Sequence, residues 1–122
     1  MNQITELKND QEILFDDFNN LGNYYELSNK EEIFDFLDEH PYLVFDLYNA
    51  YPFIRKYFES NELSLEFVPD PEIKELNSIC IYISVDENSF DENYKVLDEL
   101  ENEMFNSNVN FIAKILFQLD LR

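Results

Sequence analysis

The hydrophobic periodicity of this chain changes at Leu63, and that change limits the folds open to it. Before Leu63, apolar residues recur every three or four positions, which is the spacing of one face of an α-helix. From Leu63, apolar and polar residues alternate in LSLEF (63–67) and again in ICIYISV (79–85). Alternation is typical of a strand that is buried on one side. The sequence therefore predicts a helical first half followed by a sheet.

Two helices are expected before residue 41. Residues 3–21 carry an amphipathic stripe that ends just before Gly22, a residue suited to the left-handed position after a helix. A second helix begins near Ser28, where a Ser or Asn is followed three residues later by Glu, the spacing of a capping box. It ends at His40, because Pro41 pushes the residue before it out of the helical region.

Two further helices and a last strand complete the pattern. A third helix spans 41–58, with a kink or break near residues 48–51 because Pro52 has no N–H to donate. A fourth runs from a capping box at Ser89 and Glu92 to about Phe105. Residues 109–119 alternate again and predict a final strand.

The expected fold is α+β, with the element order α-α-α-β-β-α-β and two layers, helices packed on a three-stranded, mainly antiparallel sheet. The position of the last strand decides the pairing. Beside the first strand it makes every pair antiparallel, in the order 2-1-3, which we favour; beside the second it makes one pair parallel. We divide the chain into an N-terminal amphipathic acidic helix (1–27) and a compact domain (28–122).

Charge is the strongest functional indication. The chain has 27 acidic and 8 basic residues, for a net charge of −19, spread along its whole length. Such a field repels nucleic acids and anionic membranes and attracts basic proteins. A single cysteine permits no internal disulfide, and there is neither a membrane-spanning run nor a signal peptide. We expect a cytoplasmic protein that binds a basic partner and has no direct contact with nucleic acid or membrane.

No catalytic, cofactor or metal site is expected. His40 stands alone, without a neighbouring nucleophile, and is interpreted as the end of a helix. Cys80 lies among isoleucines and is interpreted as a core residue. Gly22 is the only glycine, so no phosphate-binding loop can form. The abundant carboxylates are interpreted as a solvated surface, with a cation site as the alternative. Enzymatic activity is therefore not expected.

Two groups of residues are predicted to bind a partner. Glu92, Glu99 and Glu103 fall on one side of the fourth predicted helix. Carboxylates one turn apart are separated by ~6 Å, close to the phosphate spacing of DNA, so this row could mimic a nucleic acid. Three aromatic residues, Phe45, Phe53 and Tyr57, lie off the apolar stripe of the third helix. The N-terminal helix could also pair with a second copy, giving a homo-oligomer.

A wider pattern carries a family resemblance. Three segments resemble a family of small, uncharacterised, acidic prokaryotic proteins. They are HPYLVFDLYNAYPFIRKYF (40–58), LEFVPDPE (65–72) and FDENYKVLDELENEMF (90–105). The resemblance implies a compact, antitoxin-like or accessory partner of another protein. The relatives carry tryptophans late in the last helix, whereas this chain has none.

Our first hypothesis is a non-enzymatic acidic module that binds and restrains or accompanies a basic partner. The alternatives are a nucleic-acid mimic that inhibits a defence nuclease, of anti-CRISPR or anti-restriction type, and a carboxylate-based cation-binding protein.

Overall fold

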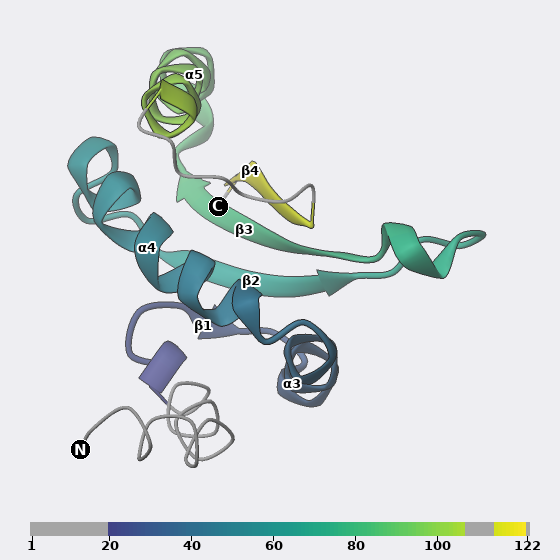
Figure 1. Ribbon diagram of the computed structural model, residues 1–122. Helices are drawn as coiled ribbons and strands as arrows, with labels where there is room; N and C mark the ends of the chain where they lie inside the picture. Colours follow the sequence, from purple (N-terminus) through teal and green to yellow (C-terminus); the bar gives the residue numbers. More distant parts are fainter. Residues whose placement is uncertain (1–19, 107–113, 122) are drawn as a thin grey trace, which may run out of the picture.

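The computed structural model describes residues 20–106 and 114–121. In this part of the chain the helices are α3 (Lys30–Glu39), α4 (Tyr42–Tyr57) and α5 (Phe90–Asn106). The strands are β1 (Glu26–Leu27), β2 (Leu63–Val68), β3 (Ser78–Val85) and β4 (Ile115–Leu121), and short 3₁₀ turns, η1 (Lys74–Leu76) and η2 (Glu87–Ser89), precede β3 and α5 (Figure 1). The α+β class is confirmed. Most of the helix expected over 3–21, and residues 109–113 of the predicted last strand, lie outside the described residues.

The sheet differs from the prediction. It has four strands in the order β1-β2-β3-β4, with β2 and β3 antiparallel and the two outer pairs, β1–β2 and β3–β4, parallel. The three-stranded, mainly antiparallel sheet in the order 2-1-3 is therefore wrong, and so is the predicted element order. The last strand pairs with β3 because the chain crosses back through α5 and returns in the same direction, as parallel neighbours require.

Strand β1 was not expected at all. It contains two residues, Glu26 and Leu27, which pair with Ser64 and Leu65 of β2. Two residues are too few to produce an alternating pattern that could be recognised in the sequence. The strand is continued by a single bond from the Ser28 N–H to the Leu65 carbonyl, 3.0 Å long.

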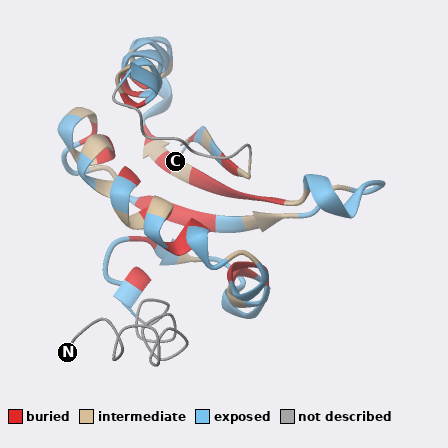
Figure 2. Cartoon of the chain, viewed as in Figure 1, coloured by how far each residue is buried: buried red, intermediate tan, exposed pale blue. Residues whose placement is uncertain are grey.

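The buried residues form one core on one side of the sheet. Alternate positions of β2, β3 and β4 belong to the same hydrophobic cluster as the buried faces of the three helices. These sheet positions are Leu63, Leu65, Ile79, Ile81, Ile83, Val85, Ile115 and Leu119. Among the intervening positions, Glu66, Leu116 and Gln118 are exposed, whereas Ser64, Ser78 and Cys80 are buried. Within the described residues, the protein thus has two layers, with helices on one face of the sheet (Figure 2).

The segment before β1 is anchored in this core. Leu21 and Tyr25 are almost completely buried, and the Tyr25 hydroxyl donates a hydrogen bond of 2.7 Å to the Leu47 carbonyl in α4. Tyr24 and Tyr25 also make edge contacts with the ring of Tyr51. Residues 20–27 are therefore held against α4 by both packing and hydrogen bonding.

Two local predictions need correction. Gly22 does not adopt a positive φ angle; the residue that does is Asn29, at φ 55°, directly before α3. Asparagine tolerates this region better than most residues. Of the kink or break predicted near residues 48–51, the break does not occur, since α4 continues through Pro52 to Tyr57. None of the described helices is long and apolar enough to cross a membrane.

Candidate functional site

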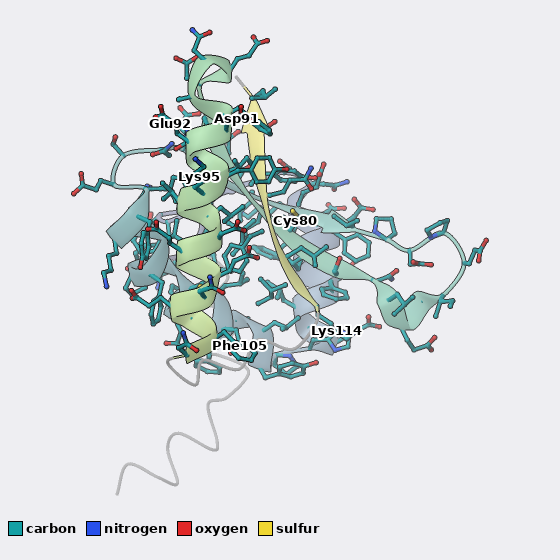
Figure 3. The ribbon with its side chains drawn as sticks, turned by 90° about the horizontal axis from the view of Figure 1, so that it is seen from above. Cys80, Asp91, Glu92, Lys95, Phe105 and Lys114 are labelled. Atoms are coloured by element: carbon teal, nitrogen blue, oxygen red, sulfur yellow. The ribbon has the colours of Figure 1, made fainter. Side chains whose placement is uncertain are left out.

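Helix α5 presents a strongly acidic outer face. It buries Leu97, Leu100 and Met104, and Phe90 and Val96 pack partly against the core, so most of its other positions face solvent. These positions carry Asp91, Glu92, Asp98, Glu99, Glu101 and Glu103, against the single lysine Lys95. Burial, and then repulsion by Asp98, raise the pKa of Glu101. Figure 3 shows Asp91, Glu92 and Lys95 toward the N-terminal end of this helix and Phe105 at the other. The like charges on α5 thus already repel one another.

The three predicted carboxylates of α5, Glu92, Glu99 and Glu103, are not all free of contacts within the chain. Glu92 and Glu99 are exposed. Glu103 is engaged within the chain: its Oε1 accepts hydrogen bonds from Lys56 Nζ at 2.8 Å and from the Tyr57 hydroxyl at 2.6 Å. The bond from Lys56, followed by that from Tyr57, lowers the pKa of the Glu103 carboxyl. Glu103 and Tyr57 therefore join α5 to α4.

The predicted Ser89–Glu92 capping box does not form. The Ser89 hydroxyl lies 3.4 Å from the Asp86 carbonyl and accepts a bond from Asn93 Nδ2 at 3.2 Å. The chain enters α5 through η2, in which the Asp86 side chain accepts the Asn88 N–H at 3.3 Å. Glu92 is consequently not used in starting the helix, and its side chain points to solvent.

The three predicted aromatic residues of α4 do not form one patch. Phe45 is 55% exposed, whereas Phe53 and Tyr57 are half-buried and pack against the core. Phe45 instead lines a hollow of about 450 Å³ with Asn20, Asn23, Tyr24 and Tyr48. Of the three, only Phe45 is therefore open to an incoming partner.

His40 lies at the end of α3, as the sequence indicated. Its backbone N–H bonds to the Phe36 and Leu37 carbonyls, and its ring lies 4.7 Å from the ring of Phe36. The side chain lines a hollow of about 490 Å³. The other lining residues are Phe36, Glu39, Lys74, Glu75, Asn77 and Lys114. No serine, threonine or cysteine lines this hollow, so His40 has no hydroxyl or thiol nucleophile of these residues to activate there.

Cys80 is buried, at 2% exposure, on the face of the sheet opposite the helices (Figure 3). Burial raises the pKa of its thiol to about 11. A thiol of this kind is a poor nucleophile, because the thiolate is the reactive form. The placement in a strand agrees with the interpretation of Cys80 as a structural residue.

The Pro-Asp-Pro-Glu part of the family-like motif forms a turn. The Asp70 carboxylate accepts the backbone N–H groups of Glu72 at 2.9 Å and Ile73 at 2.8 Å, and these bonds lower the pKa of Asp70. Asn77 Oδ1 in turn accepts the Asp70 N–H at 2.7 Å. The most specific piece of the pattern thus fixes the connection between β2 and β3.

One polar hollow was missed by the sequence analysis. It has a volume of about 310 Å³ and is lined by Ser28, Ser64, Glu66, Tyr82 and Asp120. These residues come from β2, β3, β4 and the end of β1, and they share the face away from the helices. The alternation in LSLEF and ICIYISV placed Ser64, Glu66 and Tyr82 on one face. It gave no sign that β1 and β4 would lie beside them.

The described residues offer no obvious metal centre, since they contain no group of three or more His, Cys, Asp or Glu side chains arranged to hold an ion. Comparison with known proteins found no matching family model, no matching curated protein and no matching solved structure. The function must therefore be inferred from the charges and contacts of this chain.

Proposed function

We propose that this chain is a non-enzymatic, acidic protein-interaction module that binds and restrains or accompanies a basic protein partner. The resemblance given above supplies the antitoxin-like or accessory character of the role. A cytoplasmic location belongs to the same proposal, as does the absence of direct binding to nucleic acid or membrane. Homo-oligomerisation through the N-terminal helix remains a separate prediction.

The observation that carries the proposal is how the few lysine and arginine side chains are bonded. Lys56 forms an ion pair with Glu103. Arg55 is turned inward, where NH1 donates to the Phe58 and Asn61 carbonyls at 3.0 and 2.8 Å. Lys114 Nζ donates to the Glu75 carbonyl at 2.6 Å. The acidic excess of the sequence is therefore left largely unneutralised at the surface, where it attracts a basic protein.

The chemistry of the reactive side chains supports binding rather than catalysis. His40 lines a hollow that contains no serine, threonine or cysteine, and burial raises the pKa of the Cys80 thiol to about 11. Acid–base catalysis needs a group whose pKa lies near the working pH and a partner within hydrogen-bond reach. The raised pKa of the Cys80 thiol lies well away from neutral pH.

The experiment is affinity capture with the full chain from a lysate of the source organism, followed by mass spectrometry. We expect enrichment of a basic protein, bound with an affinity that falls steeply as NaCl is raised. The Glu92→Gln/Glu99→Gln variant, which removes two exposed charges of α5, should capture less of it. Enrichment of neutral or acidic proteins only, or capture that salt does not weaken, would refute the proposal.

The same captured partner separates the alternatives. If the chain is a nucleic-acid mimic, duplex DNA should displace it from its partner. If the chain binds its partner outside the nucleic-acid site, the complex should survive the addition of DNA. A cation-binding protein predicts a rise in melting temperature with Ca²⁺ or Mg²⁺ beyond that given by NaCl of equal ionic strength. The engagement of Glu103 by Lys56 and Tyr57 makes α5 a poorer mimic than its sequence indicates.

A further inference from the structure

The hollow beside Phe45 is built mainly from aromatic rings. It has a volume of about 450 Å³, and its lining consists of Asn20, Asn23, Tyr24, Phe45 and Tyr48. Tyr24 precedes β1, whereas Phe45 and Tyr48 are three positions apart in α4 and therefore lie on the same side of that helix. The rings of Tyr24 and Tyr48 meet at 86°, with their centroids 5.5 Å apart. Two segments of the chain thus bring three rings to one hollow.

The Phe45 ring is open to solvent at this hollow. Its side chain is 55% exposed, and the Tyr24 side chain is 39% exposed. Aromatic side chains are enriched where proteins bind one another, because a ring buries a large area with little loss of conformational freedom. Exposed rings gathered around a hollow are therefore typical of a binding surface.

The same group of rings already holds one guanidinium within the chain. The Tyr24 ring contacts the ring of Tyr51, with the centroids 4.7 Å apart. The Arg55 guanidinium carbon lies 5.2 Å from the centroid of the Tyr51 ring, and Arg55 Nε donates to the Tyr51 hydroxyl at 3.1 Å. The face of an aromatic ring attracts a cation electrostatically. Tyr24, Phe45 and Tyr48 offer rings of the same kind to a cation from outside.

The charge around the hollow favours such a cation. The lining consists only of described residues and contains no lysine or arginine. The described segment that supplies it, residues 20–49, carries seven acidic residues, from Glu26 to Asp46, against the single lysine Lys30. The field of these carboxylates attracts a cation toward the hollow before it meets the rings.

We propose that this hollow receives an arginine side chain of the basic partner. The inference rests on the proposed function and adds a contact separate from α5, which supplies none of the lining residues. A guanidinium is planar and more weakly hydrated than an ammonium, so it stacks well on aromatic faces. The side-chain amide oxygens of Asn20 and Asn23 are acceptors for its N–H groups. Rings and amides together match both the flat shape and the donors of an arginine.

Two other occupants match the hollow less well. A second copy of the chain would bring a net charge of −19 to a surface of the same sign, and like charges across an interface oppose binding. Residues 1–19 contain five carboxylates, one lysine and no arginine, so this segment has no guanidinium to insert. An arginine of another, basic protein is the occupant that complements both the rings and the charge.

The test uses the full-length chain and a fluorescein-labelled deca-arginine peptide, with binding followed by fluorescence anisotropy at about 150 mM NaCl. Phe45→Leu removes the ring and keeps an apolar side chain and the net charge. We expect it to weaken binding about threefold, the value for one cation–π contact at an exposed site. The matched control is Phe105→Leu, at a phenylalanine of α5 that is 82% exposed. It makes the same change away from the hollow and should leave the affinity unaltered.

A second pair of variants fills the hollow instead of emptying it. Asn23→Arg gives the hollow an arginine of the chain's own at an exposed position and should compete with the peptide. Asn88→Arg makes the same charge change at an exposed position of η2 and should weaken binding less. Melting curves and sedimentation of all four variants report their folding and their oligomeric state.

The outcomes are distinct. Equal affinities of Phe45→Leu and Phe105→Leu for the peptide would overturn the assignment of the hollow and leave the proposed function standing. Failure of the unaltered chain to bind the peptide would overturn both. A fall in melting temperature of more than about 4 °C with Phe45→Leu, but not with Phe105→Leu, would mean that the chain itself covers the ring. A dimer that Phe45→Leu dissociates would mean that a second copy covers it. Either of these last two results would contradict the inference.

Discussion

The Tyr25 hydroxyl offers a sharp test of how residues 20–27 are held. Tyr25 is 1% exposed, and its hydroxyl donates to the Leu47 carbonyl at 2.7 Å across the core. Tyr25→Phe removes this one bond and leaves the ring in place. A buried hydrogen bond between neutral groups contributes about 1 kcal/mol net, so the free energy of unfolding should fall by about that amount. For a domain of this size the melting temperature should fall by about 4 °C.

The assay is urea unfolding followed by circular dichroism at pH 7, with Tyr24→Phe as the matched control. Tyr24 is 39% exposed, so loss of its hydroxyl should change the free energy of unfolding by less than about 0.5 kcal/mol. Burial raises the pKa of Tyr25 above its ordinary value of 10.0. The unfolded chain therefore loses this proton first, and stability falls as the pH rises above 10. Tyr25→Phe should remove part of that alkaline loss. Equal effects of the two substitutions would refute the role given to Tyr25.

Three further changes test other contacts. Burial raises the pKa of the Cys80 thiol from 9.0 to about 11, so its reaction with a disulfide reagent at pH 8 should be at least about a hundredfold slower in the folded chain than in denaturant; equal rates would contradict its burial. The folded-state pKa of Glu103 is lowered, so the stability from its bonds is present above the ordinary pKa of 4.5 and lost as the pH falls through the folded value. Glu103→Gln should therefore flatten the loss of stability in acid, measured by urea unfolding between pH 6 and pH 3, and Glu99→Gln should not. Leu100→Ala empties a fully buried position and should cost about 2–5 kcal/mol of unfolding free energy in the same assay; a cost below about 1 kcal/mol would mean that α5 is not part of the core.

The local part of the fold could be predicted because each signal lies within a few residues. The alternation of Leu63, Leu65 and Phe67 identified β2, and the apolar spacing of Leu97, Leu100 and Met104 identified the buried side of α5. Pairing of strands distant in sequence carries no such signal. The last strand could lie beside either neighbour with the same face buried, so the parallel pairing with β3 was missed.

The spatial arrangement of the candidate site residues could not be predicted for a similar reason. Glu103 and Tyr57 are 46 residues apart in the sequence, and their hydrogen bond exists because α4 and α5 pack together. Helical spacing alone placed Glu103 with Glu92 and Glu99 as a free carboxylate. The polar hollow needed the register of three strand pairs before Ser64, Tyr82 and Asp120 could be placed near one another. The acidic character, in contrast, follows from composition and needed no structure.

The most direct test of the central claim is a binding footprint by nuclear magnetic resonance. The isotope-labelled full chain would be titrated with the captured basic protein, and the backbone amide shifts would be followed residue by residue. We expect the largest changes along the acidic outer face of α5, including Glu92 and Glu99. Changes concentrated around Phe45 and His40, with α5 unaffected, would contradict the proposed function.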